Sequence, residues 1–363
     1  MNKLIPITLI SFVLSGPAFA EEVVMGAIFP MSGSSATGGE DERRGVDLAV
    51  EKINANGGVL GSPLKVIVED SGGRTPTAID AAKKLIAINK TPVIIGEFGS
   101  GVTIPVAEYV QQQGKVHINI AASSTQMRTL GRGVFSVLGL DDTLGSYAAE
   151  DIYSSGKRKI AVFVPNNAYG QGVSEVLSAK YKALGGEVVA TILYAEGQTS
   201  YRRELQQLEQ SKPDLYVYSA YGKESSTINR ESFELGLSDT PWYGIYLTMC
   251  TADSDPNFTE GQTGVDLNYT GPNGAEYEKA YKEKFKMDFA STYNGFAYDA
   301  VMIAAAAINE AKSTDPVKVT EAMFKVGNGF NGATGDITFD SNGQRTVQPY
   351  LKMHMVNGKP VAD

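Results

Sequence analysis

The stretch Ile94–Thr125, I-I-G-E-F-G-S-G-V-T-I-P-V-A-E-Y-V-Q-Q-Q-G-K-V-H-I-N-I-A-A-S-S-T, reads as a strand, a glycine turn, a helix and a second strand. Ser100 stands at the turn into the helix, where a hydroxyl and unpaired backbone N–H groups can hold an anion. The second strand runs out into Ala121-Ala122-Ser123-Ser124, which offers further donors. Adjacent strand ends of an open α/β sheet form a ligand crevice. The stretch therefore predicts a site for a small carboxylate-like ligand.

Strand-like and helix-like stretches alternate through most of the chain. Val23–Phe29 is a continuous apolar run, typical of a strand covered on both faces, and apolar residues at helical spacing follow between about Asp41 and Ile53. A second series of the same kind runs from Ile160–Val164 to Gly264–Leu267. This succession predicts an α/β fold with two doubly wound units, each with its own parallel sheet.

The last hundred residues depart from this alternation. Ala275–Phe324 carries a helical pattern, whereas Asp336–Phe339 and Tyr350–Val356 read as strands. We expect these two strands to be joined through the turn Asp340-Ser341-Asn342-Gly343. That D-x-N-G favours a hairpin turn over a calcium loop, because the remaining ligand positions are absent.

The beginning of the chain predicts export. Met1–Ala20 has one early cation, a short apolar core and the small-x-small sequence Ala18-Phe19-Ala20, so we expect a secretory signal peptide cleaved after Ala20. A membrane anchor is the alternative, but the run is shorter than the ~20 residues of a span. The net charge of -9 argues against a nucleic-acid partner. Cys250 is the single cysteine, which excludes an internal disulfide and favours a small buried side chain.

Catalytic motifs are missing from the sequence. His117 and His354 both fall inside apparent strands, where a packed side chain is a better interpretation than a general base. No nucleophile elbow, P-loop, zinc-protease motif or paired C-x-x-C occurs. We therefore expect no enzyme, no catalytic residue, no metal and no cofactor, although a hydrolase that uses only carboxylates stays open.

Six motifs in a fixed order give the chain a family resemblance. Their ordered set resembles the leucine/isoleucine/valine-type periplasmic binding proteins, the type I solute-binding proteins of branched-chain amino acid ABC importers. The motifs are G-A-I-F-P-M-S-G (26–33), R-G-V-D-L-A-V-E-K-I-N-A-N-G-G-V-L-G (44–61), G-E-F-G-S-G (96–101), A-A-S-S (121–124), N-N-A-Y-G-Q-G (166–172) and N-G-F-A-Y-D-A-V (294–301).

The resemblance implies two lobes that close like a hinge on a ligand held between them. It implies a first lobe of residues 22–141 plus 269–345 and a second lobe of residues 142–268 plus 346–363. It also implies a periplasmic receptor that delivers an amino acid or related small carboxylate to an ABC importer permease. We expect such a receptor to act as a monomer.

The same resemblance assigns site residues. Ser100, Ala121 and Ser123 are expected to hold the ligand's carboxylate, which agrees with the anion site inferred from the strand ends. Tyr169 and Tyr221 are expected to close over the ligand from the second lobe, and Tyr246 is expected to belong to the same half of the site. Ala122 is expected among the ligand-binding residues of the first lobe. The alternatives are a plain helix cap for Ser100 and surface-loop aromatics for Tyr169 and Tyr221.

Two departures from the family pattern bear on the ligand. Amino-acid-binding relatives place an acidic residue where this chain has Tyr246, and a phenol cannot neutralise a buried ammonium. Either Glu224 or Glu97 substitutes, or the ligand is an aromatic or aliphatic acid, an amide or a urea-like molecule without an α-ammonium group. Gly38 stands where relatives often carry an aromatic, so we expect room for a larger side group.

Overall fold

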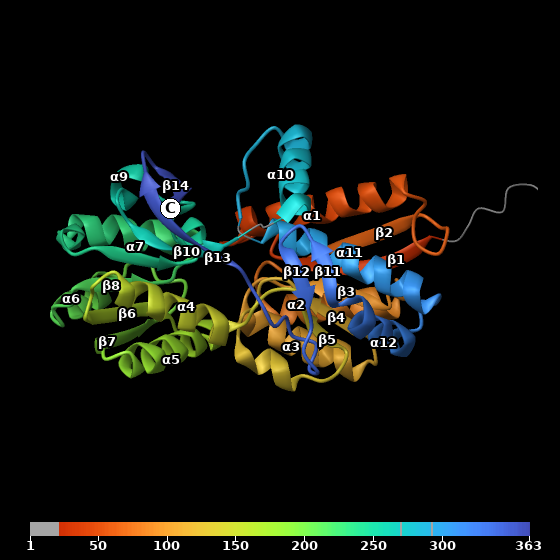
Figure 1. Ribbon diagram of the computed structural model, residues 1–363, viewed down its shortest axis with the longest axis horizontal. Helices are drawn as coiled ribbons and strands as arrows, with labels where there is room; N and C mark the ends of the chain where they lie inside the picture. Colours follow the sequence, from red (N-terminus) through yellow and green to blue (C-terminus); the bar gives the residue numbers. More distant parts are fainter. Residues whose placement is uncertain (1–21, 269–270, 292) are drawn as a thin grey trace, which may run out of the picture.

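The computed structural model describes residues 22–363 except 269, 270 and 292, and two sheets organise it (Figure 1). The first lobe is the part built on a parallel sheet with the strand order β2-β1-β3-β4-β5, on the right in Figure 1. Its strands are β1 (Val23–Phe29), β2 (Leu64–Asp70), β3 (Val93–Gly96), β4 (Val116–Asn119) and β5 (Val134–Ser136).

Helices cover both faces of this sheet, as its continuous apolar strands require. Ala27 and Phe29 join one core cluster with residues of α1 and α11, whereas Ile28 points to the other face and packs with residues of α2 and α3. The helices of this lobe are α1 (Ala36–Ala55), α2 (Thr75–Ala87), α3 (Ser100–Gln112), α10 (Gly271–Phe285), α11 (Asn294–Ala311) and α12 (Pro316–Val326).

The second lobe is built on a sheet with the order β14-β13-β10-β9-β8-β6-β7, on the left in Figure 1. Its strands are β6 (Lys159–Pro165), β7 (Glu187–Tyr194), β8 (Leu215–Tyr218), β9 (Trp242–Ile245), β10 (Thr263–Leu267), β13 (Tyr350–Val356) and β14 (Lys359–Ala362). The helices are α4 (Asp141–Ser154), α5 (Ala168–Ala183), α6 (Arg202–Glu209), α7 (Lys223–Glu234), α8 (Leu247–Thr251) and α9 (Pro256–Thr259).

Both sheets contain the same five-stranded unit. In chain order each unit is arranged 2-1-3-4-5, a doubly wound topology whose switch point lies between its first and third strands. The switch points therefore lie between β1 and β3 in the first lobe and between β6 and β8 in the second. Crevices for ligands form outside the carboxyl ends of the strands at such points.

The sequence prediction was wrong at the C-terminal strands. Residues 336–339 do not form a hairpin with β13, because β12 (Gly335–Thr338) pairs with β11 (Asn328–Gly332). The turn at Asp340 does reverse the chain as expected, since Phe339 forms an antiparallel bridge with Arg345, and the Asp340 carboxylate accepts N–H bonds from Asn342 and Gln344 at 2.8 and 3.0 Å. β13 crosses to the second lobe and pairs antiparallel with β10 and β14, so the second sheet is mixed rather than purely parallel.

The first helix begins at Ala36, earlier than the expected start near Asp41. Gly38 and Gly39 weaken the helical pattern of this turn, but the glycines serve packing: a Cβ at Gly39 would lie 2.4 Å from the Pro30 carbonyl oxygen. Tertiary contact with the loop after β1 thus overrides local propensity.

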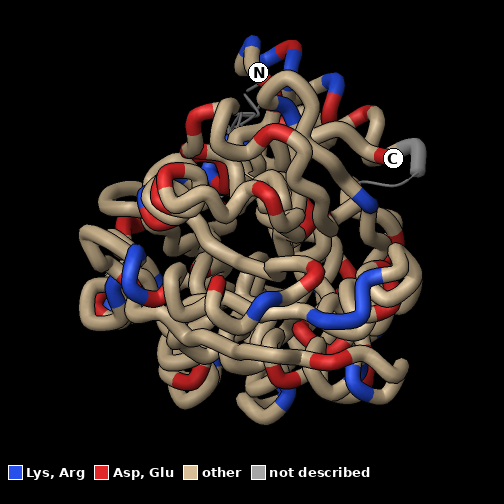
Figure 2. Tube along the Cα trace, turned by 90° about the vertical axis from the view of Figure 1, so that its left-hand side faces the viewer, with Lys and Arg blue, Asp and Glu red and all other residues tan. Residues whose placement is uncertain are grey.

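Surface charge, helix hydropathy and the start of the chain are relevant to where in the cell the protein resides. Lys and Arg are interspersed with Asp and Glu around the end of the second lobe that faces the viewer in Figure 2. Among the described residues, no helix is both long and apolar enough to cross a bilayer. The expected signal peptide, residues 1–20, lies outside the described residues. Cys250 is buried, as expected.

Candidate functional site

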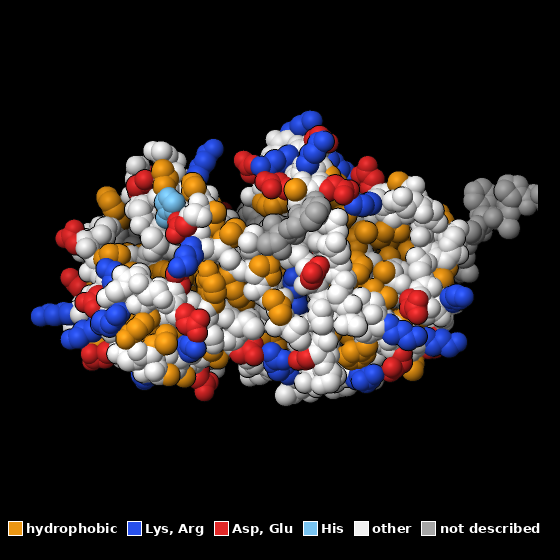
Figure 3. All heavy atoms as spheres, in the orientation of Figure 1, with side chains coloured by type: hydrophobic (Ala, Val, Ile, Leu, Met, Phe, Trp, Pro, Cys, Tyr) orange, Lys and Arg blue, Asp and Glu red, His pale blue; other side chains and the backbone are white. Residues whose placement is uncertain are grey.

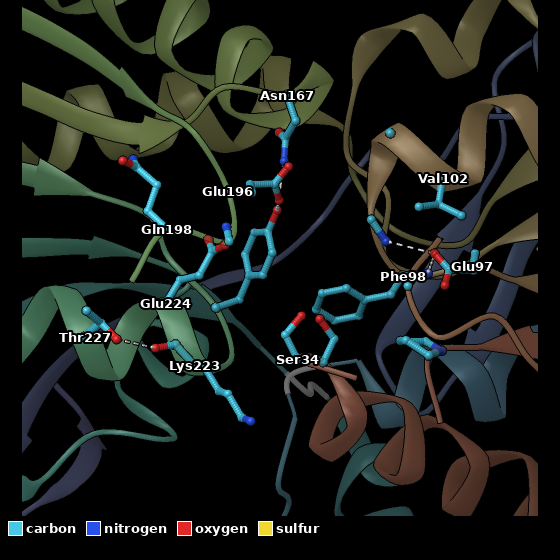
Figure 4. A pocket seen from close by; sticks show the side chains of 17 residues that line it. Ser34, Glu97, Phe98, Val102, Asn167, Glu196, Gln198, Lys223, Glu224 and Thr227 are labelled. Carbon is cyan, nitrogen blue, oxygen red and sulfur yellow. Dashed lines mark hydrogen bonds between the residues drawn. The ribbon is translucent and has the colours of Figure 1, made fainter. Parts of the chain in front are cut away.

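A cavity of about 580 Å³ lies between the two lobes. Its lining comes from loops that follow β1, β2 and β3 in the first lobe and β6, β7 and β8 in the second, so both switch points open into it. Figure 3 shows hydrophobic side chains gathered where the lobes meet, and Figure 4 shows polar side chains of the second lobe facing the first across the gap. The polar and charged side chains in the lining are Ser34, Ser35, Glu97, Asn167, Glu196, Gln198, Tyr221, Lys223, Glu224 and Thr227.

A smaller hollow of about 20 Å³ lies next to this outer cavity and shares Phe98, Gly99 and Tyr221 with it. That volume holds about one water molecule. Most of the predicted site residues meet here: the hollow is lined by Phe98, Gly99, Ser100, Ala121, Ser123, Tyr169, Tyr221, Met249 and Tyr293. We call the two spaces the outer and the inner compartment.

The first-lobe wall is a polar turn held rigid by hydrogen bonds. Ser100 begins α3, is 3% exposed, and its Oγ accepts the Ser124 N–H at 3.3 Å. Asn119 at the end of β4 organises the small residues: its Oδ1 accepts the N–H groups of Ala121 at 3.3 Å and Ala122 at 2.9 Å. The Ala122 N–H is thus engaged within the turn, and Ala122 does not line the inner compartment.

Asn119 was missed by the sequence analysis. Its Nδ2 also donates to the Ala122 carbonyl at 2.7 Å and to Ser136 Oγ at 2.9 Å on β5. The available signal was an asparagine at a strand end followed by small residues, because asparagine side chains characteristically bond to backbone groups two or three residues on.

The second-lobe wall consists of aromatic rings anchored by their hydroxyl groups. Tyr169, in the first turn of α5, shares a 2.7 Å hydrogen bond with Ser219 Oγ. The hydroxyl of Tyr221 accepts from Asn167 Nδ2 at 2.8 Å and donates to Glu196. These bonds hold both rings from behind, so that each presents its apolar body to the inner compartment.

Tyr246 lies behind this wall rather than in the lining. It follows β9 in the left-handed region, with φ at 61°, and is fully buried. Its ring packs against Tyr169 and Tyr293, with centroid distances of 6.4 and 5.7 Å. Its hydroxyl has no hydrogen-bond partner of good geometry among the described residues. Tyr293, just before α11, lines the inner compartment and was not predicted.

Glu97 and Glu224, the two side chains considered as replacements for the acidic residue that the family places at Tyr246, lie in different environments. Glu97 is fully buried and accepts hydrogen bonds from the Ser71 hydroxyl and from the Phe98 and Gly99 N–H groups. Burial nevertheless raises the pKa of Glu97 to about 7. Glu224 lines the outer compartment, binds the Gly197 N–H, and burial raises its pKa also to about 7.

Asp141, a further buried carboxyl group, was missed, as was Glu42, whose carboxyl oxygens also have no hydrogen-bond partner of good geometry among the described residues. Asp141 begins α4, where the chain enters the second lobe, and its N–H donates to the Ser123 carbonyl at 2.7 Å. It is fully buried, and neither carboxyl oxygen has a hydrogen-bond partner of good geometry among the described residues. Burial raises its pKa to about 8, a rise that the nearby Ser123 hydroxyl opposes.

Gly172 makes room for this carboxyl group, because a Cβ there would lie 2.8 Å from Asp141 Oδ2. The second glycine of the Y-G-Q-G motif was thus the available sequence signal for a close neighbour. Asp141 also contributes to the raised pKa of Tyr169 and Tyr246, which rises mainly because both hydroxyls are buried.

The space beside Gly38 is largely taken by Phe98, and a hollow of about 30 Å³ remains there. A Cβ at Gly38 would lie 3.4 Å from the Phe98 ring, so an aromatic from the β3–α3 loop occupies the space that we expected a larger ligand group to use. The space is therefore smaller than expected, because the ring that borders it belongs to a residue 60 positions away in the chain that only the fold brings close.

Neither histidine is placed for catalysis. His117 is fully buried in β4, where burial lowers its pKa to about 3. His354 lies in β13 and pairs with Asp363 at the partly exposed edge of the second sheet. In the part of the chain that the structure describes, no three His, Cys, Asp or Glu side chains are grouped to hold a metal ion.

Comparisons with known proteins agree with this architecture. The family model described as "Periplasmic binding protein" matches residues 22–359. An amino acid binding protein of Pseudomonas aeruginosa is 29% identical, over 85% of this chain and 83% of its own length. The structure is similar to a leucine binding protein, LivK, from Thermotoga maritima, with a TM-score of 0.87, 24% identity, and coverage of 94% of this chain and 97% of that one.

A further similar structure is an ABC transporter solute binding protein from R. palustris in complex with benzoate. Its TM-score is 0.84 at 20% identity, covering 94% of this chain and 95% of that one. The chain therefore belongs to the periplasmic binding protein family, whose members are extracytoplasmic binding proteins rather than enzymes.

Proposed function

We propose that this protein is a solute-binding receptor that captures an amino acid or a related small carboxylate between its lobes and delivers it to the permease of an ABC importer. One observation carries the proposal: the serine-containing strand ends of the first lobe and the tyrosines of the second face the same inner compartment. Resemblance to named amino acid and leucine binding proteins supports it.

The carboxylate of the ligand binds at the first-lobe wall. Ser100 and Ser123 offer hydroxyl groups, the start of α3 offers backbone N–H groups, and Ala121 offers an N–H whose internal bond is long at 3.3 Å. Tyr169 and Tyr221 then cover the bound molecule from the second lobe, with Tyr246 supporting Tyr169 from behind.

The ligand's ammonium group pairs with Asp141. This carboxyl group is buried next to Ser123, just outside the lining of the inner compartment, and neither of its oxygens has a hydrogen-bond partner of good geometry among the described residues, whereas Glu97 is already bonded by a hydroxyl and two N–H groups. A buried carboxylate is stable only when it is paired, so an incoming cation would lower the pKa of Asp141 and be held in return. Asp141 thereby replaces the acidic residue that Tyr246 displaces.

An aromatic acid is the second candidate ligand. The inner compartment is lined by four aromatic rings, those of Phe98, Tyr169, Tyr221 and Tyr293, and a flat ring could stack on them when the lobes part to admit it. The similarity to the benzoate-bound protein from R. palustris also supports this class. In this case Asp141 stays protonated, since an anion close to Ser123 disfavours a second negative charge.

Lobe closure accompanies binding. We propose the lobe boundaries given above, residues 22–141 plus 269–345 and residues 142–268 plus 346–363, with hinge segments that include those between β5 and α4 and between β12 and β13. We further propose a periplasmic monomer, exported by a signal peptide cleaved after Ala20.

Calorimetry at pH 8 with L-leucine, L-valine, benzoate and 4-hydroxybenzoate tests the proposal. We expect one ligand per chain, recovery of the ligand chemically unchanged, and a smaller radius of gyration in solution scattering after binding. Binding by none of the carboxylates, or conversion of a bound probe to product, would contradict the receptor function. Leucine bound and benzoate not bound selects the first candidate, and the reverse selects the second.

A further inference from the structure

Two aromatic residues separate the hollows of the cleft from one another. Phe98 and Tyr221 line the outer compartment, the inner compartment and a third hollow of about 30 Å³ near Gly38 and Met249. Their ring centroids lie 5.9 Å apart at an interplanar angle of 78°, an edge-to-face contact between the lobes. The contact stands between a space of about 20 Å³ and one of about 580 Å³.

The two rings are held in different ways. Tyr221 is fixed at its hydroxyl by Asn167 and Glu196, both on the second lobe. Phe98 has no polar atom in its ring and is held only by packing, edge-on against Tyr293 at 5.5 Å and over Gly38. Figure 4 shows Phe98 reaching from the first lobe toward the side of the cleft that carries Asn167 and Glu196.

Building on the proposed function, we propose that Phe98 is the residue that limits ligand length in this receptor. A molecule whose carboxylate is held by Ser100 and Ser123 extends toward the Phe98–Tyr221 contact. Because the inner compartment of about 20 Å³ holds only about one water molecule, even a short side group parts the Phe98 and Tyr221 rings, and a longer one has to displace the Phe98 ring further. Because Tyr221 is anchored and Phe98 is not, the position of Phe98 sets the limit.

The outer compartment is large enough to hold the part of a long ligand that Phe98 excludes. Its volume of about 580 Å³ lies within the range of about 300–1,000 Å³ that small-molecule sites occupy. Removing the Phe98 ring would join the inner compartment to it, and a long ligand could then keep its carboxylate at the serines while its tail lies in the outer space. Ligand length is thus controlled by one side chain rather than by the overall size of the cleft.

A length series read by calorimetry tests this inference. The probes are unbranched amino acids from L-norvaline to L-2-aminodecanoate, together with benzoate and biphenyl-4-carboxylate. One of the two series, amino acids or aromatic acids, should bind to the unaltered protein. Within that series we expect the longest probe to bind at least tenfold more weakly than the shortest. In Phe98→Ala we expect the long member to gain at least tenfold and the short member to lose affinity, because its apolar contact with the ring is gone.

Further variants distinguish a changed limit on ligand length from a folding defect in Phe98→Ala. Phe98→Leu keeps an apolar side chain and should shift the limit to intermediate length, and Phe98→Trp should shift it to shorter ligands. Phe233→Ala is the matched control, since that ring is 47% exposed and packs on Phe258 away from the cleft. The control should leave the length profile unchanged.

The outcomes separate the inference from the function it rests on. The unaltered protein could bind short carboxylates while every Phe98 variant shows the same dependence of affinity on ligand length as the unaltered protein. In that case another residue limits ligand length, and the inference is overturned while the receptor function stands. If the unaltered protein binds no carboxylate of either series, the proposed function fails and the inference fails with it. A reordered profile in the Phe98 variants alone supports the inference.

Discussion

The two walls of the cleft differ in the size and type of their side chains. The first-lobe wall consists of short residues at strand ends, where Asn119 and Ser100 fix the backbone by hydrogen bonds. The second-lobe wall consists of large rings whose hydroxyl groups are engaged at their backs, as in Tyr169 and Tyr221. From this difference we infer two roles: the first wall binds the charged group of the ligand, whereas the second wall excludes water and selects ligands by shape.

The double variant Ser100→Ala plus Ser123→Ala should have the largest effect, because it removes both hydroxyl groups from the recognising wall. Hydrogen bonds to a charged group contribute about 1.5–3 kcal/mol each, so the loss of two should weaken carboxylate binding by roughly 100-fold or more. Calorimetry measures the affinity. Ser124→Ala is the matched control, since Ser124 belongs to the same turn but does not line the inner compartment. Equal losses in both variants would contradict the assignment.

Gly222→Ala should act on the second wall as a whole. A Cβ at this position would lie 2.4 Å from the Ser34 carbonyl oxygen on the other lobe, so the added methyl group keeps the lobes apart. We expect about tenfold weaker binding of every ligand and a larger radius of gyration in the bound state. Gly236→Ala is the control, because Gly236 also has a positive φ, 77°, but no atom within 4 Å of an added Cβ. If Gly236→Ala weakened binding equally, backbone strain and not the interlobe contact would be responsible.

Asp141→Asn should change the pH dependence of stability. The pKa of Asp141 is about 8 in the folded protein and about 3.9 in an unfolded chain, so the folded state binds the extra proton between these values and stability falls as pH rises through them. Asparagine is neutral at every pH, so the variant does not lose stability as the pH rises. Without ligand, the variant should therefore melt several degrees above the parent at pH 8 and close to it at pH 4.

The control for that experiment is Asp142→Asn. This neighbour is 45% exposed and pairs with Arg128 at 2.9 Å, so it should show no gain at pH 8. Melting curves that change in parallel for both variants would show that the gain is not specific to the buried carboxyl group.

Tyr246→Phe should have the smallest effect on amino acid binding. Its hydroxyl is buried and has no hydrogen-bond partner of good geometry in the part of the chain that the structure describes, so its removal should leave the melting temperature unchanged or raised. If Asp141 takes the ammonium group, leucine affinity should change by less than about threefold. A loss of tenfold or more would show that the phenol contacts the ligand and that the second wall also recognises polar groups.

The recognising wall was predictable because its residues are close in sequence. Ser100 follows a strand and a glycine turn, and Ser123 follows the next strand, so parallel pairing alone brings them together. The doubly wound units were predictable for the same reason, since each strand and helix carries its own apolar pattern.

The remaining features depend on contacts between distant segments. Phe98 takes most of the space at Gly38, and Tyr293 reaches the inner compartment from the start of α11, but no local pattern marks either residue. Asp141 is marked only indirectly, by the second glycine of the Y-G-Q-G motif, because its burial arises where α4 packs on α5. The pairing of β13 with β10 likewise joins strands more than 80 residues apart, and the turn at Asp340 suggested a nearer partner.

The pH dependence of ligand affinity tests the central claim that Asp141 pairs with the ligand's ammonium group. Between pH 6 and 8 the ammonium stays protonated, so only an ionised Asp141 can pair with it, and leucine should bind more tightly as pH rises toward the pKa of about 8. Binding should release a proton, and Asp141→Asn should abolish both the slope and most of the affinity. Leucine binding that is equally tight at pH 6 and pH 8 and survives Asp141→Asn would contradict the account.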